Sequence, residues 1–251
     1  MTNHTNRPTL REWLEQTPFT LSLSAGFFGF YAHAGLVSVL EEEKLTPQAI
    51  TGCSAGALIG GIWSSGTKIG TVTDFLFALD RNDFWDPGFG AGLLQGQRFD
   101  DLLTPLLGCH RIEDCPVSLH ITAFKLHPMG THYLSKGPLS DAIRASCAFP
   151  GLFHPVRFEG SRYLDGGIRD RSSLGAVNDD TPTLYHHLPS RSLVRRQLSA
   201  FSDIHRRSKT ITISTAGLPR LSPFKLELGR QAFEHARHAF KAQLDKECHL
   251  P

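Results

Sequence analysis

The hydrophobic positions of this chain follow the periods of strands and helices in a regular order. Alternation over residues 19–24 predicts a strand, and apolar residues on one helical face over residues 32–45 predict a helix that Pro47 ends. A short strand over residues 49–53 and a helix of small residues over residues 54–63 follow. The order of strand, loop, helix, strand, turn and helix is typical of a parallel α/β sheet.

The rest of the chain continues this mixture. We expect helices over residues 99–107 and 140–147 and strands over residues 116–126, 131–135, 156–158, 162–164, 181–188 and 209–214, with a hairpin turn at residues 127–130. Residues 67–97 predict a short helix and then a loose loop rich in phenylalanine and glycine, which either packs in the core or forms a lid or a substrate-facing wall. An amphipathic helix that should lie on one face of the sheet ends the chain, with apolar positions at Leu226, Gly229, Phe233, Ala236, Phe240 and Leu244.

The composition and charge indicate which classes of protein this chain can belong to. A chain of 251 residues with 40% hydrophobic residues is enough for one α/β domain, and a net charge of +2 gives no reason to expect a nucleic-acid partner. The longest apolar stretch, residues 55–63, is far shorter than the roughly 18 residues that span a bilayer, and the N-terminus has no apolar signal region. If the protein meets lipid, it therefore does so only at a membrane surface. Five cysteines without a zinc spacing favour a reduced, cytoplasmic protein. A cluster of basic residues indicates a solvated surface or a weak attraction to anionic head groups: Arg191, Arg195, Arg196, Arg206, Arg207 and Lys209.

The segment Gly52-Cys53-Ser54-Ala55-Gly56 carries the pattern G-x-S-x-G between a predicted strand and a predicted helix. In this setting the serine occupies a strained turn, and the flanking glycines allow the residues before and after it to approach closely. The helix that follows directs backbone N–H groups and the positive end of its dipole at Ser54. The sequence therefore predicts Ser54 as a nucleophile.

A nucleophilic serine needs a base, and no histidine lies in an evident motif. One carboxylate follows a short strand and precedes two glycines, in Tyr163-Leu164-Asp165-Gly166-Gly167. Partial burial would raise the basicity of such an acid. Taken alone, however, the segment favours an ordinary Asp-Gly turn over a catalytic acid.

The order of three segments resembles the patatin-like phospholipase family from about residue 19 to residue 214. These segments are LSLSAGFFGFYAHAGLVSVLEEE, ITGCSAGALIGG and IRASCAFPGLFHPVRFEGSRYLDGG. The resemblance implies a three-layer α/β/α sandwich with a mostly parallel central sheet over residues 19–251, after an N-terminal extension of residues 1–18.

The resemblance also implies a function. Members of the family hydrolyse acyl esters of phospholipids, lysophospholipids, galactolipids or triacylglycerols with a Ser-Asp dyad, here Ser54 and Asp165. Backbone N–H groups at Gly26, Phe27 and Ala55 would form the oxyanion hole, in a loop that ends at Gly29. We expect a lipid acyl ester as substrate, transient contact with a membrane or lipid droplet, and neither a metal nor another cofactor.

Two segments depart from the family pattern. Ser24 stands in place of the first glycine of the loop, and Phe28 stands where a basic residue is common. After the acid, Asp170-Arg171 and Ser172-Ser173 replace the usual Asn and Pro.

Three alternatives stay open at this point. The first is a Ser-His-Asp hydrolase that uses His33, His154 or His205. The second is transfer of the acyl group to another alcohol or a thiol. The third is an inactive domain that binds a lipid or a protein.

Overall fold

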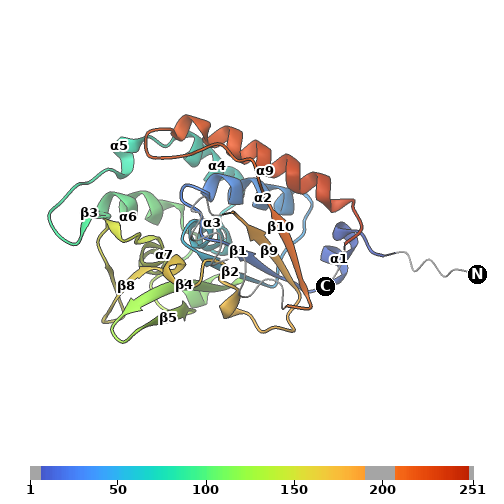
Figure 1. Ribbon diagram of the computed structural model, residues 1–251, viewed down its shortest axis with the longest axis horizontal. Helices are drawn as coiled ribbons and strands as arrows, with labels where there is room; N and C mark the ends of the chain where they lie inside the picture. The colour runs from blue at the N-terminus through green and yellow to red at the C-terminus, as the bar shows by residue number, and fades with distance from the viewer. Residues whose placement is uncertain (1–6, 190–206, 249–251) are drawn as a thin grey trace, which may run out of the picture.

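Five parallel strands form the centre of the fold. The computed structural model describes residues 7–189 and 207–248. Its main sheet carries, in spatial order, β10 (Thr210–Ser214), β9 (Thr183–His187), β1 (Thr20–Leu23), β2 (Ala49–Cys53) and β4 (Ser118–Leu126), all parallel to their neighbours (Figure 1).

Antiparallel strands extend this sheet beyond β4. β8 (Ser161–Asp165) pairs with β4 and with β7 (Val156–Phe158), and β5 (Met129–Leu134) pairs with the other edge of β4. The predicted α/β fold with a mostly parallel central sheet is confirmed. The hairpin between β4 and β5 turns on only two residues, the cis pair His127–Pro128, because the pairing continues to Met129.

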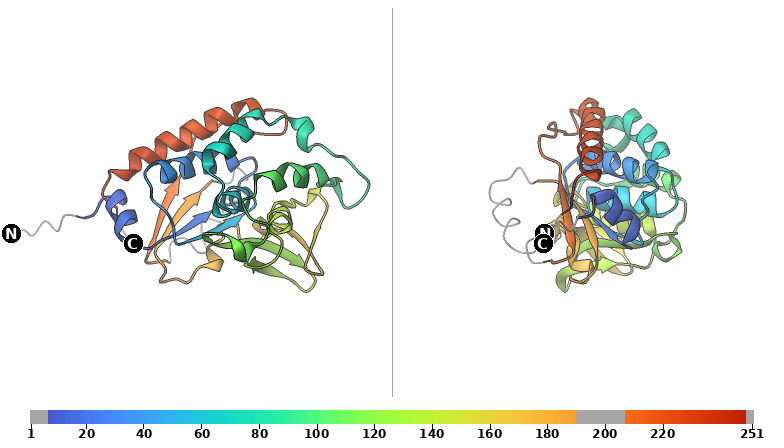
Figure 2. Two further views of the ribbon diagram at one scale, coloured as in Figure 1. Left: turned by 180° about the vertical axis from the view of Figure 1, so that it is seen from behind. Right: turned by 90° about the vertical axis from the view of Figure 1, so that its right-hand side faces the viewer.

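Helices pack in layers against one side of the sheet. α2 (Phe30–Glu42) and α3 (Ala55–Ser64) cover the strands, and α7 (Leu139–Cys147) packs beside α3. α4 (Ile69–Ala78) and the final helix α9 (Gly229–Leu244) pack onto α2, as both views of Figure 2 show.

The approach of α9 to α2 depends on Gly35. A Cβ atom at this position would lie 2.3 Å from the Phe233 carbonyl oxygen. Of the predicted apolar positions, Gly229, Phe233, Ala236, Phe240 and Leu244 are buried in α9, whereas Leu226 is half-buried and lies in the 3-10 turn before the helix.

The opposite side of the sheet is crossed by the connection from β8 to β9. This connection includes the 3-10 turns Gly166–Ile168 and Leu174–Ala176. The Ser22 and Thr51 hydroxyls donate to the carbonyl oxygens of Ser172 and Ser173, and the Thr122 hydroxyl contacts the Ser173 hydroxyl. Polar side chains of three strands therefore fasten the segment that contains Asp165 and Arg171.

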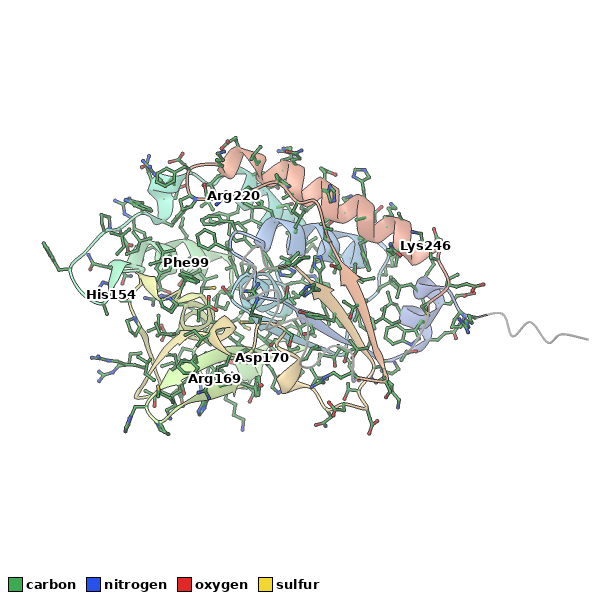
Figure 3. All side chains as sticks on the ribbon, in the orientation of Figure 1. Phe99, His154, Arg169, Asp170, Arg220 and Lys246 are labelled. Atoms are coloured by element: carbon green, nitrogen blue, oxygen red, sulfur yellow. The ribbon has the colours of Figure 1, made fainter. Side chains whose placement is uncertain are left out.

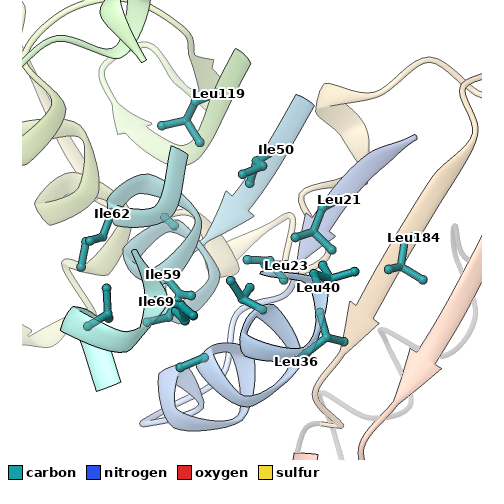
Figure 4. Packing of buried hydrophobic residues seen from close by; sticks show 14 of the residues in the cluster. Leu21, Leu23, Leu36, Leu40, Ile50, Ile59, Ile62, Ile69, Leu119 and Leu184 are labelled. Atoms are coloured by element: carbon teal, nitrogen blue, oxygen red, sulfur yellow. The ribbon is translucent and has the colours of Figure 1, made fainter. Parts of the chain in front are cut away.

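The main core lies between the sheet and the helices. Leu21, Leu23 and Ile50 project from the strands toward α2 and α3, where they meet Leu36 and Ile59 (Figure 4). Near the N-terminus, α1 (Leu10–Gln16) buries Leu10, Trp13 and Leu14 in the same core. The boundary after residue 18 stays a prediction, although residues before it share this core.

The segment from residue 67 to residue 97 contains more structure than the sequence predicted. After α4 come α5 (Arg81–Phe84) and β3 (Gly92–Leu94), and β3 pairs with β6 (Gly151–Phe153) in a separate two-stranded sheet. α6 (Gln97–Leu103) and a 3-10 turn, Thr104–Leu106, follow. The prediction of a loose loop was wrong because Gly92 packs against the backbone at Phe153 and thereby permits strand pairing.

The apolar helices, the cysteines and the basic residues bear on the environment in which the protein works. In the part of the chain that the structure describes, no helix combines the length and the apolar character needed to cross a membrane. The five cysteines are free thiols. Most of the predicted basic cluster, from Arg191 to Arg206, lies outside the described residues, and Arg207 pairs with Asp179.

Candidate active site

Ser54 occupies a strained turn between β2 and α3. Its φ of 53° and ψ of −116° lie where a residue with a side chain is uncommon. A Cβ atom on Gly52 would lie 2.5 Å from the Gly56 carbonyl oxygen, and one on Gly56 would lie 2.1 Å from the Leu23 carbonyl oxygen. Both glycines are needed because the turn brings three backbone segments together.

Ser54 and Asp165 come together because two strands meet end to end beside β4. Cys53 pairs with Thr122, and Asp165 pairs with Ala123, the next residue of β4. β5 occupies the other edge of β4 across both positions, so β2 and β8 lie on the same side of β4. Their carboxyl ends therefore face each other about one strand residue, roughly 3.3 Å, apart along β4.

Ser146 on α7 connects this junction to the strained turn at Ser54, which we call the serine elbow. The Ser54 N–H donates to the Ser146 Oγ at 2.8 Å, and the Ser146 hydroxyl donates to the Thr122 carbonyl oxygen at 2.7 Å. The thiol of Cys147 donates to the Ser54 carbonyl oxygen at 3.3 Å. The backbone of Ser54 is thus held from α7 on both sides.

Asp165 is the last residue of β8 and is only 5% exposed. Its Oδ1 accepts the Gly167 N–H at 2.7 Å, which fixes the carboxylate after the strand. A Cβ atom on Gly166 would lie 2.3 Å from the Thr122 carbonyl oxygen, so this position accommodates only glycine without rearrangement.

The thiols beside Asp165 are not prepared for nucleophilic chemistry. Burial, and then the negative charge of Asp165, raises the pKa of Cys53 and of Cys147 well above the ordinary thiol value. Both cysteines are therefore protonated at neutral pH, and the hydroxyl of Ser54 is the candidate nucleophile at this junction.

A short loop after β1 forms another wall of the site. The N–H of Gly29 donates to the Gly26 carbonyl oxygen at 2.7 Å and closes a tight turn through Phe27 and Phe28, with Phe28 at a φ of 55°. Cβ atoms on Gly26 and Gly29 would lie 2.8 Å and 2.4 Å from the Leu188 Cδ1. Among the described residues, no backbone acceptor takes the N–H groups of Gly26 and Phe27.

These predicted site residues line one cavity. Its volume is about 1080 Å³, and Gly26, Phe27, Ser54, Ala55 and Asp165 all contribute to its wall. Many of the other lining residues are aromatic: Phe28, Phe75, Phe84, Phe99, Phe149 and Phe153. Phe75 of α4 and Phe84 of α5 thus face the cavity, in agreement with the alternative of a substrate-facing wall, whereas Phe77 of α4 packs against Phe233 of α9.

The two segments that depart from the family pattern are each bonded to their surroundings. Ser24 uses its hydroxyl to accept the Leu188 N–H at 2.9 Å. The Asp170 carboxylate accepts the N–H groups of Ser172, Ser173 and Gly175 at 3.1, 2.9 and 3.2 Å and thereby shapes the loop after the acid. Arg169 and Asp170 lie on the far side of the molecule from α9, whereas Arg220 lies beside that helix (Figure 3).

None of the described histidines lines the cavity. His33 is fully buried between the Ser24 carbonyl oxygen and the Nδ1 of His186, at 2.8 and 2.9 Å. Burial lowers the pKa of His33 to about 4. His154 packs against Gly90, and His205 lies outside the described residues. The geometry gives no support to a triad through His33 or His154.

The α/β fold, in which Ser54 and Asp165 lie where β2 and β8 meet, agrees with the family that the three sequence segments resemble. Comparison with known sequences gives the same result. The sequence model of the patatin-like phospholipase family matches residues 21–177, more than half of the chain. The chain belongs to this family, whose members are lipid ester hydrolases.

Relatives with similar sequences belong to the NTE group. An uncharacterised NTE family protein of Mycobacterium bovis is 30% identical over an alignment of 167 residues, which covers 64% of this chain and 46% of that protein. The lysophospholipase nte1 of Emericella nidulans is 26% identical over an alignment of 193 residues, gaps included, which covers 66% of this chain and 12% of that protein. The chain therefore spans less than half the length of the mycobacterial relative.

Solved structures show the same fold. VipD from Legionella pneumophila superposes with a TM-score of 0.63 at 14% identity, covering 91% of this chain and 67% of VipD. The type III effector protein ExoU superposes with a TM-score of 0.52 at 16% identity, covering 90% of this chain and 52% of ExoU.

Proposed function

We propose that this chain is a serine hydrolase that cleaves acyl esters of phospholipids, lysophospholipids or acylglycerols. The observation that carries the proposal is the end-to-end meeting of β2 and β8, which puts Ser54 and Asp165 into the wall of one apolar cavity. At about 1080 Å³ the cavity is at the upper end of ligand sites, which typically measure about 300–1,000 Å³.

In the proposed first step, Asp165 takes the proton of the Ser54 hydroxyl as its oxygen attacks the ester carbonyl. The N–H groups of Gly26 and Phe27, together with Ala55 at the start of α3, stabilise the negative charge that develops on the carbonyl oxygen. The bond to the alcohol breaks, the alcohol leaves with the proton that Asp165 had taken, and an acyl-serine remains. Asp165 then accepts a proton from the water that attacks the acyl-serine and returns it to the Ser54 oxygen as the fatty acid leaves.

The lining favours an acyl chain over a small polar ester. Aromatic and aliphatic side chains surround the serine, and removing an alkyl chain from water into such a site contributes about 0.8 kcal/mol for each buried methylene. Transfer of the acyl group to another alcohol would begin with the same step as hydrolysis. The reaction products should therefore also be analysed in the presence of added acceptor alcohols.

A lipid surface is the proposed source of the substrate. Phe27, Phe149 and Ile168 line the cavity and are also 59%, 37% and 40% exposed, so the apolar wall continues onto the surface of the molecule. The rings of Phe27 and Phe149 lie 6.1 Å apart and form one patch. An apolar rim of this kind suits transient contact with a membrane or a lipid droplet.

The test is release of fatty acid from a lipid panel that includes lysophosphatidylcholine, phosphatidylcholine and a monoacylglycerol. Ser54→Ala and Asp165→Asn should each lower kcat by at least about 10³-fold, and the double variant should lose little more, because the two residues act as a unit. Asp141→Asn on α7 removes a carboxylate outside the cavity wall and serves as the control. An Asp165→Asn enzyme with wild-type turnover would contradict the dyad, and an inert wild type with no labelling of Ser54 by a fluorophosphonate would favour a binding domain.

A further inference from the structure

Successive carbonyl groups of the loop after β1 are each held by a different donor. The Nε2–H of His33 donates to the Ser24 carbonyl oxygen at 2.8 Å, and the guanidinium Nη2 of Arg171 donates to the Ala25 carbonyl oxygen at 3.0 Å. The Gly29 N–H donates to the Gly26 carbonyl oxygen at 2.7 Å. Hydrogen bonds thus fix the orientation of three consecutive peptide units. Two of these bonds come from side chains outside the loop, and the third comes from the loop's own turn.

This arrangement determines where the loop's N–H groups point. The C=O and N–H of one trans peptide unit are coplanar and point in opposite directions. The unit that Arg171 holds through the Ala25 oxygen therefore directs the Gly26 N–H away from Arg171. Among the described residues no backbone acceptor takes this N–H, and Gly26 lines the cavity together with Ser54.

Arg171 is bound to Ala25 through its backbone as well as through its side chain. The Ala25 N–H donates to the Arg171 carbonyl oxygen at 2.7 Å, so the two residues are joined twice. A Cβ atom on Gly167 would lie 3.2 Å from the Ala25 Cβ, which shows how closely the loop after Asp165 approaches the loop after β1. The Asp170 carboxylate holds the backbone that follows Arg171 in place.

The charge of Arg171 adds to this geometric effect. A hydrogen bond from a guanidinium is charge-assisted and stronger than one between neutral groups. It also polarises the peptide unit that accepts it, so the N–H at the other end of that unit becomes a better donor. Arg171 itself lines the cavity, where solvent screening is lower than at an open surface.

From these contacts we propose that Arg171 is a positioning residue of the oxyanion hole, which orients and polarises the Gly26 N–H for the tetrahedral intermediate. The inference rests on the proposed function. It assigns a role in catalysis to a residue of the loop after the acid, whose side chain acts through the Ala25 peptide and not by contact with the reacting atoms.

The experiment compares Arg171→Met and Arg171→Lys with Arg169→Met and Ser54→Ala, using p-nitrophenyl butyrate as an uncharged substrate. Arg169 lies two positions earlier and stacks over Phe124 at 5.4 Å, outside the cavity wall, so its variant removes the same charge from the same loop. Thermal unfolding of every variant measures folding separately. Inhibition by an alkylboronic acid, which forms a tetrahedral adduct on the serine, reports directly on the oxyanion hole.

For Arg171→Met we expect kcat to fall roughly 100-fold with KM changed less than about threefold, because a donor directed away from the oxyanion loses most of its effect. The boronate Ki should rise by a similar factor. Arg171→Lys should recover part of the loss, since it keeps the charge but not the fork of donors. Arg169→Met should behave as the wild type does.

Three results would overturn the inference, each in a different way. If Arg171→Met keeps kcat and the boronate Ki within about twofold of Arg169→Met while Ser54→Ala is inactive, Arg171 has no positioning role and the proposed function stands. If the wild-type turnover persists in Ser54→Ala, the proposed function fails and the inference fails with it. A loss of kcat in Arg171→Met without a change in the boronate Ki also contradicts the role, because it places the defect outside the oxyanion hole.

Discussion

Whether the serine elbow can form depends on the space beside a single residue, Gly56. The space opposite Gly56 is taken by the Leu23 carbonyl oxygen, 2.1 Å from the position of an added Cβ atom, and Leu23 is the last residue of β1. A side chain here pushes the elbow and this strand apart. The same substitution at Gly70, at the start of α4, meets no atom within 4 Å.

We therefore expect Gly56→Ala to destabilise the protein by at least about 2 kcal/mol and to abolish turnover. Gly70→Ala should stabilise it by about 0.5–1 kcal/mol, because alanine loses less conformational entropy than glycine in a helix. Urea unfolding and ester hydrolysis of both variants check this pair. Equal stability of the two variants would show that the elbow relaxes around a methyl group.

Ser146 is the second residue on which the site depends. It lies in the segment IRASCAFPG that the family resemblance includes, but the sequence assigned it no role. Ser146→Ala leaves the Ser54 N–H and the Thr122 carbonyl oxygen without their partner. A buried polar group without a partner costs about 1–3 kcal/mol, so we expect a loss of that size in urea unfolding and a lower kcat. Ser38→Ala is the matched control, because the Ser38 hydroxyl on α2 likewise has two partners, the Gly35 carbonyl oxygen and the Arg237 Nη1 of α9, but lies outside the cavity wall; it should change kcat little.

Some residue roles were predictable and others were not. The glycines at positions 52, 56, 166 and 167 follow from motif spacing, because a tight turn leaves no room for a side chain. Arg171, His33 and Ser146 act through contacts between residues distant in the chain, such as the 146 positions between Arg171 and Ala25. Sequence spacing does not contain that information.

At the scale of elements, the buried histidine pair joins α2 to β9 and to the segment after β10. His33 Nε2 must donate to the Ser24 carbonyl oxygen, so a neutral His33 accepts at Nδ1 from the Nδ1–H of His186. The Nε2 of His186 then accepts the Thr215 hydroxyl at 2.9 Å. Protonation of His33 would set two N–H groups against each other, and burial lowers the pKa of both rings.

This pair predicts acid lability. Because the folded pKa of His33, about 4, lies below its ordinary value of 6.5, the unfolded chain binds more protons between these two values. The stabilisation by the neutral ring is fully present above pH 6.5 and is lost as the pH falls toward 4, with a slope of up to about 1.4 kcal/mol per pH unit. Urea unfolding of the wild type between about pH 4.5 and 7.5 should follow this trend.

His33→Leu should flatten the dependence, whereas His238→Leu, on the exposed side of α9, should leave it unchanged. Parallel curves for the wild type and His33→Leu would show that other groups cause the acid lability.

Helices and strands were predicted correctly where a single hydrophobic period runs through the segment. The prediction failed for short strands that form only by pairing with another strand. The strands before and after α2 and the apolar stripe of α9 were evident from the sequence. β3 and β6 have three residues each, too few for a period to be visible. They form because Gly92 pairs with Gly151 and Leu94 pairs with Phe153, and the whole of β4, β5 and α7 lies between these partners in the chain.

At the scale of the whole molecule, the proposed contact with lipid depends on the apolar rim of the cavity. Phe149 contributes to both the cavity wall and the exposed surface, whereas Met129, 70% exposed, lies on the hairpin between β4 and β5. Transfer of an aromatic side chain from water into a lipid interface contributes about 1.5 kcal/mol, equivalent to about tenfold in binding.

Phe149→Ser should therefore reduce co-sedimentation with phosphatidylcholine vesicles about tenfold, and Met129→Ser should not. Equal losses for both variants would contradict a specific lipid-facing rim.

The end-to-end junction of β2 and β8 has a consequence for the order in which catalytic competence arises. The turn at Ser54 has all its backbone partners once β4 has joined β2 and α7 has packed beside them, but Asp165 arrives only with the final residue of β8. A chain that has folded only as far as α7 carries the Ser54 hydroxyl without Asp165 beside it. Under the proposed dyad, such an intermediate would leave ester bonds intact, and hydrolysis would begin only when β8 pairs with β4.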